Sequence, residues 1–426
     1  MGVAYDLFGN GKTALKFNYG KYLSYAANDS PYTSTNPGAT IVRSVTNRGW
    51  TDGNKNYVVD CNLLNPALQD SLATGGDLCA AASSTAANFG KPGGATIVDP
   101  GVLSGWGVRP GDTQYTFTVQ QQVIPRVSAD FSYTHRVFKG FFVTTDLNKH
   151  AGGVLSGSPA GSYETYTLTA PVDARLPGGG GYPVTVYAPT AAANAVAAKP
   201  YLVRESDLGA ERDSHWDGVE FNVNARFRGG LITQFGTSTG RGVVNTCETI
   251  QLYAPTTATN TGSAGPDPRG CNNEEPFQTK IRGLASYTIP KVDVLVSATV
   301  RSTANSLVNA NWQIPNSVVQ SALGHLPPGA TATGTTTIAL TDNENRLYVG
   351  DRRTTVDMRF AKVLRFNRTR TDIGVDLNNM LNTNYPTSYN GTYIYTTDNT
   401  PRPGGFLAPT AIYNPRFVRL NFTVNF

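Results

Sequence analysis

The sequence predicts an all-β fold: an antiparallel meander of about eleven strands that forms part of a transmembrane β-barrel. Three observations carry this prediction. Segments of about ten residues alternate between apolar and polar side chains, as strands with one apolar face do. The segments come in couples joined by tight turns, and long connections separate the couples. The composition agrees, because charged residues make up only 15% of the chain while Gly contributes 44 of its 426 residues.

The alternating segments form five couples and a closing strand. Within residues 217–227, for example, the apolar Val219 and Phe221 flank Glu220. Each couple is joined by a short segment rich in Gly, Pro or Asn, as hairpin turns require. The expected strands are 2–8 with 12–23, 113–123 with 126–138, 217–227 with 231–240, 281–289 with 292–300, 354–364 with 370–381, and finally 417–426.

Tight turns and long connections alternate along the whole chain. In a meander, this order places every tight turn at one end of the strands and every long loop at the other. Outer-membrane barrels have short periplasmic turns and long extracellular loops, whereas long structureless loops are uncommon in compact soluble domains. We therefore expect one partial barrel over residues 1–426, with extracellular loops at about 24–110, 139–215, 241–278, 303–351 and 382–410.

The strand count is odd, whereas single-chain bacterial barrels have an even number of strands. If the tight turns are periplasmic, the first strand runs toward the periplasm. Eleven strands then fit the second half of a 22-stranded barrel of the plugged-transporter type. We expect no signal peptide at the start of the chain, since Asp6 falls where an apolar region should begin, and no apolar run is long enough for a transmembrane helix. We expect Met1 to be an internal start and Phe426 to lie in the periplasmic aromatic girdle.

Several blocks of the sequence resemble one family. They are GVAYDLFGNGKTALKFNYGKYL, GWTDGNKNYVVDCNLLNP, DARLPGGGGY, WDGVEFNVNARF, GTSTGR, GLASYTIPKVDV and LRFNRTRTDIGVDLNNMLN. In this order, from about Gly2 to Phe426, they are similar to the C-terminal β-barrel of Oar-like TonB-dependent receptors. The resemblance implies a location in the outer membrane and energised uptake of a bulky nutrient. It also implies barrel assembly machinery that recognises the terminal Phe426, and a TonB complex acting through an N-terminal plug that these residues do not include.

One polar segment is a candidate calcium site. In TDGNKNYVVDC, oxygen-bearing side chains recur at Asp52, Asn54, Asn56 and Asp60, the alternation with which a loop wraps Ca²⁺. Tyr57, however, stands where an EF-hand loop has Gly, and no closing Glu follows. The alternative is an Asn/Asp-rich turn whose side chains bond their own backbone. No other cofactor is expected.

The four cysteines pair by position, Cys61 with Cys79 and Cys247 with Cys271. Each pair lies within one polar segment, which favours two loop-closing disulfides in an oxidising compartment. Four free thiols are the alternative. A zinc site is disfavoured, because neither pair has a Cys-x-x-Cys spacing or a neighbouring His.

The polar face of the predicted strands should line the barrel lumen. Its charged residues could contact a plug, line a water-filled path or remain solvated, and their mixed signs argue against a selective ion filter. The opposite face should contact outer-membrane lipid, and no run of basic residues suggests a nucleic-acid partner. The expected lumen residues are Lys16, Asp130, Glu220, Arg226, Asp293, Asp357, Arg359, Asp376 and Arg419.

Two short motifs resemble enzyme motifs without their structural context. The segment GTSTG (236–240) has the spacing of a nucleophile elbow, but it ends a predicted strand and no helix follows. The segment GNGKT (9–13) resembles the end of a P-loop, but it lies in a hairpin turn. We therefore expect no enzyme. The alternatives to a receptor are a passive porin-like channel and a secreted or surface β-rich adhesin or binding module.

Overall fold

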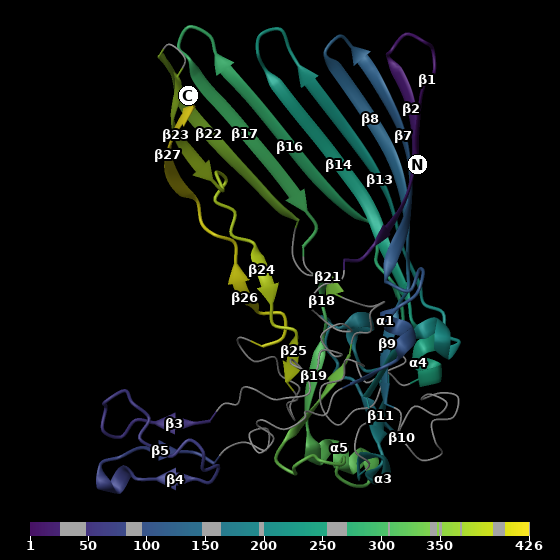
Figure 1. Ribbon diagram of the computed structural model, residues 1–426, viewed down its shortest axis with the longest axis vertical. Coiled ribbons are helices and arrows are strands. Elements are labelled where there is room, and N and C mark those ends of the chain that lie inside the picture. The colour runs from purple at the N-terminus through teal and green to yellow at the C-terminus, as the bar shows by residue number, and fades with distance from the viewer. Residues whose placement is uncertain are drawn as a thin grey trace.

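The computed structural model describes residues 1–25, 48–81, 96–146, 163–195, 200–253, 271–305, 307–340, 347–348, 352–366, 369–394 and 405–425. Its elements form two regions (Figure 1). One is a large antiparallel sheet, which we call the wall. The other is a group of smaller sheets and short helices at one end of the wall, which we call the loop layer.

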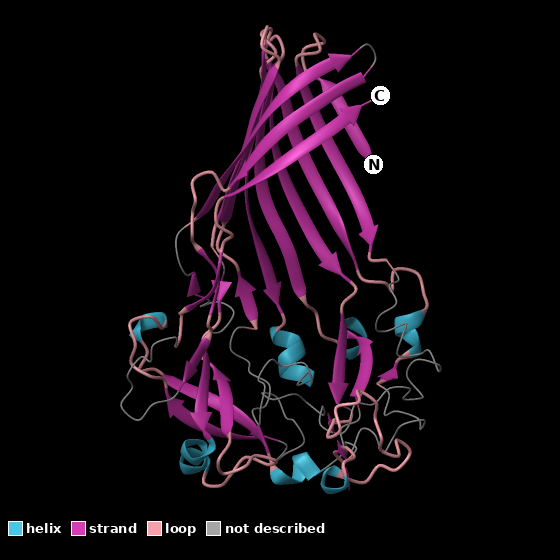
Figure 2. Cartoon of the chain, turned by 90° about the vertical axis from the view of Figure 1, so that its left-hand side faces the viewer, coloured by secondary structure: helices cyan, strands magenta, loops and turns pink. Residues whose placement is uncertain are grey.

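The wall is an open sheet whose eleven strands follow chain order, so the predicted meander is confirmed. It is strongly curved, as two perpendicular views show (Figure 1, Figure 2). A short additional strand, β15 (Asn272–Glu274), pairs with the end of β14. The eleven strands are β1 (Gly2–Asp6), β2 (Thr13–Leu23), β7 (Gly111–Ile124), β8 (Val127–Lys139), β13 (Asp213–Arg226), β14 (Ile232–Asn245), β16 (Gln278–Ile289), β17 (Val294–Thr303), β22 (Arg353–Phe366), β23 (Thr369–Asn378) and β27 (Phe417–Asn425).

Cross-strand register places the apolar side chains of the wall on one face. Phe17 lies opposite Phe117, which in turn lies opposite Tyr133. At the other end of the sheet, Val375 lies opposite Leu420. Because side chains alternate between faces, the polar residues between these positions share the other face. The apolar face is largely uncovered, and its exposed aromatic and aliphatic side chains run from β1 to β27.

The tight turns lie at the end of the wall opposite the loop layer (Figure 1). Their backbones adopt left-handed conformations, with φ of 65° at Gly9, 71° at Arg126, 88° at Gly230 and 70° at Lys291. Hairpin turns favour positive φ because the resulting twist matches that of the flanking strands. Gly meets this requirement without strain.

The long connections carry secondary structure of their own, which the sequence analysis did not predict. Besides three- and two-stranded sheets, they contain short α- and 3₁₀-helices. The elements are β3 (Trp50–Thr51), β4 (Gln69–Asp70), η2 (Leu72–Thr74), β5 (Leu78–Cys79), β6 (Ile97–Val98), α1 (Pro100–Leu103), β9 (Phe142–Asp146), β10 (Tyr163–Thr169), η4 (Pro177–Gly179), β11 (Pro183–Pro189), α3 (Ala191–Ala195), β12 (Pro200–Arg204), η5 (Glu205–Leu208), α4 (Cys247–Tyr253), β18 (Leu307–Val308), β19 (Asn311–Pro315), α5 (Asn316–Leu323), β20 (Thr335–Ala339), β21 (Leu347–Tyr348), β24 (Pro386–Tyr389), β25 (Thr392–Ile394) and β26 (Pro409–Ile412).

The hydrophobic core lies in the loop layer and not in the wall. Three connections that are far apart in sequence build it: the β10–β11 hairpin, the β19–α5–β20 segment, and residues around Tyr393 and Phe406. Ile314 and Ile338 are fully buried there. The Tyr182 hydroxyl donates a hydrogen bond to the Leu340 carbonyl at 3.0 Å, which ties two of the connections together.

The DARLPGGGGY block shapes this core. Its glycines adopt positive φ, and a Cβ on Gly180 would lie 1.8 Å from the Pro171 carbonyl oxygen, so only Gly fits there. Arg175 pairs with Asp173 and donates to the Phe406 carbonyl at 2.8 Å. Among the residues that the structure describes, no helix has the length and apolar character needed to cross a bilayer.

Candidate functional site

The polar face of the wall forms the candidate site, because register aligns its side chains in rows across many strands. One row runs through Lys16, Thr118, Ser132, Glu220, Ser238 and Lys280. The next runs through Gln120, Asp130, Asn222, Gly236, Arg282 and Arg301. Each row thus aligns on one face residues that are more than 250 positions apart in the sequence, such as Lys16 and Lys280, with four strands between them.

Side chains in the first strands of these rows bond to one another. The Lys16 ammonium donates to Gln120 Oε1 at 2.6 Å, and Asn222 Nδ2 donates to Asp130 Oδ2 at 2.9 Å. Two of the expected lumen residues thereby have uncharged partners on adjacent strands. Glu220 and Arg226 lie on the same face and are exposed.

A second polar group occupies the same face near the C-terminal edge. Asp376 is buried and lies between two arginines, with Arg419 Nη2 at 3.1 Å and Arg359 Nε at 3.7 Å from its carboxylate oxygens. Arg359 also donates to Asn421 Oδ1 at 2.6 Å. Buried charges need partners, and Arg419 satisfies only Asp376 Oδ2, whereas Asp376 Oδ1 and Arg359 Nε are buried without a hydrogen-bond partner. The network joins three of the expected lumen residues.

Two expected lumen residues have more local roles. The Asp357 carboxylate accepts the backbone N–H of Asn379 at 2.8 Å, where the chain leaves β23 for the loop layer. Asp293 is not on the wall: it lies in the turn before β17 with φ of 47°, and its carboxylate pairs with Arg365 at 3.0 Å. The prediction of a lumen-facing Asp293 is therefore wrong, since the strand begins one residue later.

Three cations on the polar face were not among the predicted residues. Lys280, Arg282 and Arg301 line an open hollow of about 730 Å³ together with Trp216, Glu220 and Asn222. Lys280 and Arg301 each lie one residue beyond the strand ends that the sequence predicted. The alternation of charged and apolar positions would have found them if those strands had been extended.

Three of the four calcium-candidate side chains meet in the segment 52–60, where Asn54 and Asn56 both donate through Nδ2 to Asp60 Oδ2. Asp52 Oδ2 accepts the Tyr57 N–H at 2.9 Å, and Lys55 and Tyr57 both have φ of 60°. Asn54 and Asn56 bond the backbone two residues ahead, as the turn alternative predicts. Asp52 Oδ1 is buried without a hydrogen-bond partner. Within the described residues, no group of three or more His, Cys, Asp or Glu is placed to hold a metal.

Asp77 and a disulfide organise the same small unit. The buried Asp77 carboxylate accepts N–H groups of Asp60 (2.9 Å), Trp50 (2.9 Å) and Gly53 (3.2 Å). These donors, Asp60 first, hold the pKa of Asp77 below its usual value. The structure joins Cys61 to Cys79 in this unit and Cys247 to Cys271 at the start of α4.

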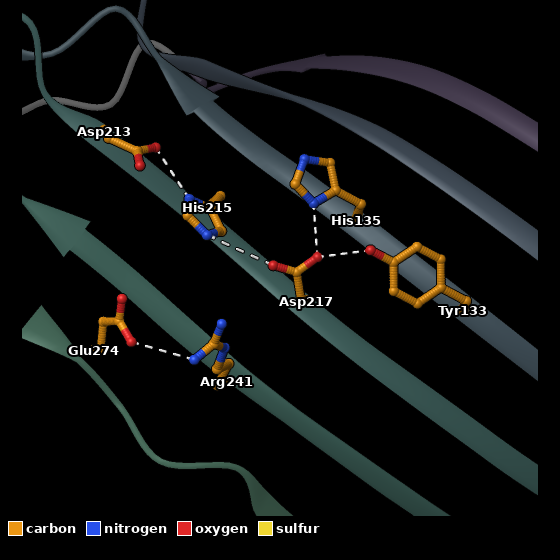
Figure 3. Close-up of polar contacts among 7 residues, drawn as sticks. All are labelled: Tyr133, His135, Asp213, His215, Asp217, Arg241 and Glu274. Atoms are coloured by element: carbon orange, nitrogen blue, oxygen red, sulfur yellow. Dashed lines mark hydrogen bonds and ion pairs between the residues drawn. The ribbon is translucent and has the colours of Figure 1, made fainter.

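A polar cluster lies on the other, apolar face, where the strands meet the loop layer (Figure 3). The Asp217 carboxylate accepts the Tyr133 hydroxyl and lies 2.8 Å from His135 Nδ1. His215 Nε2 is 3.6 Å from the same carboxylate, while Arg241 pairs with Glu274 at 3.3 Å. The cluster ends the run of apolar side chains on these strands.

Phe426, the expected girdle residue and assembly signal, lies outside the described residues.

The chain was compared with known proteins. No family profile matches the sequence, and no curated protein matches it. Among solved structures, the outer membrane transporter YddB from Escherichia coli is similar with a TM-score of 0.37 and 10% identity. The aligned region covers 99% of this chain and 39% of that chain, so this chain spans well under half the length of the transporter. A similarity this low carries no argument about function.

Proposed function

We propose that the chain is the C-terminal part of the β-barrel of an outer-membrane transporter, of the Oar-like TonB-dependent receptor class, that takes up a bulky nutrient. The observation that carries the proposal is the uncovered apolar face of the wall. Phe117, Phe221 and Phe422 expose 45%, 39% and 67% of their surface on it. A face of this kind needs an apolar environment, and lipid supplies one along the whole sheet.

The ends of the apolar face have the side chains expected at a bilayer surface. At the loop end, the rings of Tyr19 and Tyr115 are in tilted contact with centroids 5.3 Å apart, close to the His135–Asp217 cluster. At the turn end, Phe8 and Phe366 are exposed. Aromatic girdles flank the apolar band of outer-membrane barrels at both interfaces, so these residues support the proposed orientation.

The two edges of the wall support a barrel with further strands. Along the described sheet, β1 pairs only with β2, and β27 pairs only with β23. Unpaired strand edges are very costly in hydrocarbon, because no water is available to satisfy their backbone groups. In the proposal, other strands of the same barrel cover these edges. A plug in the lumen would contact the polar face and engage the TonB complex.

Two alternatives remain distinct from this proposal. A passive porin-like channel would use the same wall without energy input, and it would give steady conductance in planar bilayers. A secreted adhesin or binding module would remain soluble without detergent, because its apolar face would have to be covered by protein.

The test is cell fractionation after expression with an export signal. The proposal predicts that the chain is recovered in the outer-membrane fraction and is released by detergent but not by high salt or alkaline carbonate. Recovery of the folded chain in a soluble fraction would exclude the transporter and the channel alike. Conductance in planar bilayers then tests the channel alternative, which predicts steady conductance without an energy source; a silent bilayer would exclude it.

A further inference from the structure

We infer that the polar face of the wall has an anion-binding subsite formed by Lys280, Arg282 and Arg301, which takes an organic anion whose carboxylate or phosphate group is attached to a flat apolar body. The inference deepens the proposed function by naming a ligand class. It rests on the position of the three cations, on the hollow that they line and on the aromatic ring beside them.

The three cations are adjacent, and none of them forms an ion pair among the described residues, although Glu220 and Asp130 line the same hollow. Arg282 and Arg301 are directly opposite in register on β16 and β17, and Lys280 is two residues from Arg282 on the same face. Like charges at directly opposite positions destabilise a sheet. No ion pair or hydrogen bond joins any of the three to another described side chain, in contrast to Arg359 and Arg419, which share Asp376.

Carboxylates on the same face are too far away or already bonded. Glu220 is separated from Lys280 by β14, with Ser238 between them in register. Two strand spacings correspond to about 10 Å, where salt screens most of the attraction. Asp130 is one strand farther and bonds Asn222, while Asp357 accepts the Asn379 N–H. Asp130 and Asp357 keep their negative charges, but neither pairs directly with a cation of the subsite, so the three cations form a local cluster of positive charge.

Trp216 provides the flat apolar surface next to these cations. Its indole lies over the backbone of β13 and β14, since a Cβ at Gly218 or Gly240 would come within 2.1 or 2.4 Å of the ring. Glycine at both positions lets the ring lie along the wall. Trp216 lines the same hollow as the three cations. The volume of about 730 Å³ is in the range of small-molecule sites, about 300–1,000 Å³.

The subsite lies in the half of the wall nearest the loop layer. Trp216 is the fourth residue of β13, Lys280 the third of β16, and Arg301 is two residues from the end of β17. A ligand that arrives through the loops would meet these side chains first. This location favours an incoming small anion over a protein segment held deeper in the lumen.

The experiment is calorimetric titration of the full 426-residue chain in detergent. The probes are benzene-1,3,5-tricarboxylate and phenyl phosphate, with benzyl alcohol as the neutral control. We expect both anions to bind, with affinity that falls as NaCl is raised, and benzyl alcohol not to bind. The better-bound anion identifies the preferred charged group.

Matched double variants decide where binding occurs. R282Q/R301Q removes two charges from the subsite, and K16Q/R226Q removes two from elsewhere on the same face. We expect the first to weaken binding at least about tenfold, because each anion loses charge-assisted hydrogen bonds, and the second to change it less than about twofold. R282K/R301K should recover part of the affinity, and W216A should remove the preference for aromatic anions over citrate.

Equal weakening by both glutamine doubles would overturn the inference, since it would indicate only the general charge of the face. Absence of binding of either anion to the wild-type chain would also overturn it and would leave the cations as contacts for a covering protein segment. Detergent-phase partitioning of the same samples separates this failure from that of the proposed function. If the chain partitions into detergent but binds no anion, the anion-subsite inference fails and the proposed function stands.

Discussion

In the loop layer, Ile314 and Ile338 are fully buried, whereas on the wall Leu420 exposes 79% of its surface. Both regions are built from β-strands with alternating side chains. They differ in what lies against the apolar side chains: three loop segments cover one another in the loop layer, and no described segment covers the outer face of the wall. The difference shows that alternation alone does not tell what covers an apolar face: protein covers it in the loop layer, and in the proposed function lipid covers it along the wall.

The loop core should be the more sensitive region to loss of volume. Ile314→Ala removes most of a side chain with no exposed surface, and large-to-small changes at such positions cost about 2–5 kcal/mol. We expect rapid protease cleavage in the loop layer, while the wall remains folded. Limited proteolysis with mass spectrometry measures this. Leu420→Ala is the matched control and should leave the loop fragments unchanged; simultaneous loss of both regions would contradict their independence.

A charged side chain on the outer, apolar face of the wall should lower the free energy of unfolding. Phe221→Arg places a cation on the proposed lipid face, where Arg costs about 2–4 kcal/mol near the bilayer centre. At an exposed position of a soluble protein the same change would cost less than about 0.5 kcal/mol. Urea titration of the chain folded into lipid vesicles measures the difference. Asn222→Arg, the next residue and on the polar face, is the control. Equal effects at the two positions would argue against a lipid-facing surface.

The unit around Asp52 depends on local polar links, because few of its residues are buried. We keep calcium as a prediction for this loop: Ca²⁺ at 100 times its Kd should stabilise the bound unit by about 2.7 kcal/mol. The exposed Lys55 in the loop gives a direct measurement, since trypsin cleavage after it should slow when Ca²⁺ is added. Asp52→Ala should abolish the effect. An unchanged cleavage rate would contradict calcium binding and would favour the alternative, a turn whose Asn and Asp side chains bond their own backbone.

Much of the wall could be predicted from sequence, because every second residue of a strand meets the same environment. Val219 lies on the apolar face and Glu220, the next residue, lies on the polar face, so the pattern is local. Turn residues such as Gly9 and Gly230 then fixed the strand order. The ends of the strands are predicted less accurately than their centres. Lys280 and Arg301 were missed because each lies one residue outside the predicted strand.

The loop layer was not predictable in the same way. Leu176 and Tyr182 flank a glycine run that has no periodicity, yet Leu176 belongs to the core and Tyr182 packs against it. Their partners include Leu340, 158 residues away from Tyr182. Contacts at such separation depend on how the three connections pack against one another, and no local pattern in the sequence predicts that packing.

A smaller effect should come from His325, which links two of these loops. Its Nε2 lies 3.0 Å from Glu164 Oε2, and its Nδ1 lies 2.9 Å from the Leu326 carbonyl. Both contacts need a donor on the ring, so they favour imidazolium. The Leu326 carbonyl and then the Glu164 carboxylate raise the pKa of His325 above 6.5. The link is therefore fully present below pH 6.5 and is lost as pH rises through the raised pKa.

Hydrogen exchange between pH 5 and 9, corrected for intrinsic rates, tests this link. Protection of β10 and α5 should fall across the titration of His325, whereas β22 and β23, which contain no His, should show no such step. Glu164→Gln keeps a neutral acceptor and should shift the step toward lower pH. An identical step in that variant would mean that Glu164 does not hold the charge. A titrating surface pair between two loops can loosen the loop layer, whereas the wall is held by a continuous strand ladder that contains no such link between β22 and β23, so it should not respond.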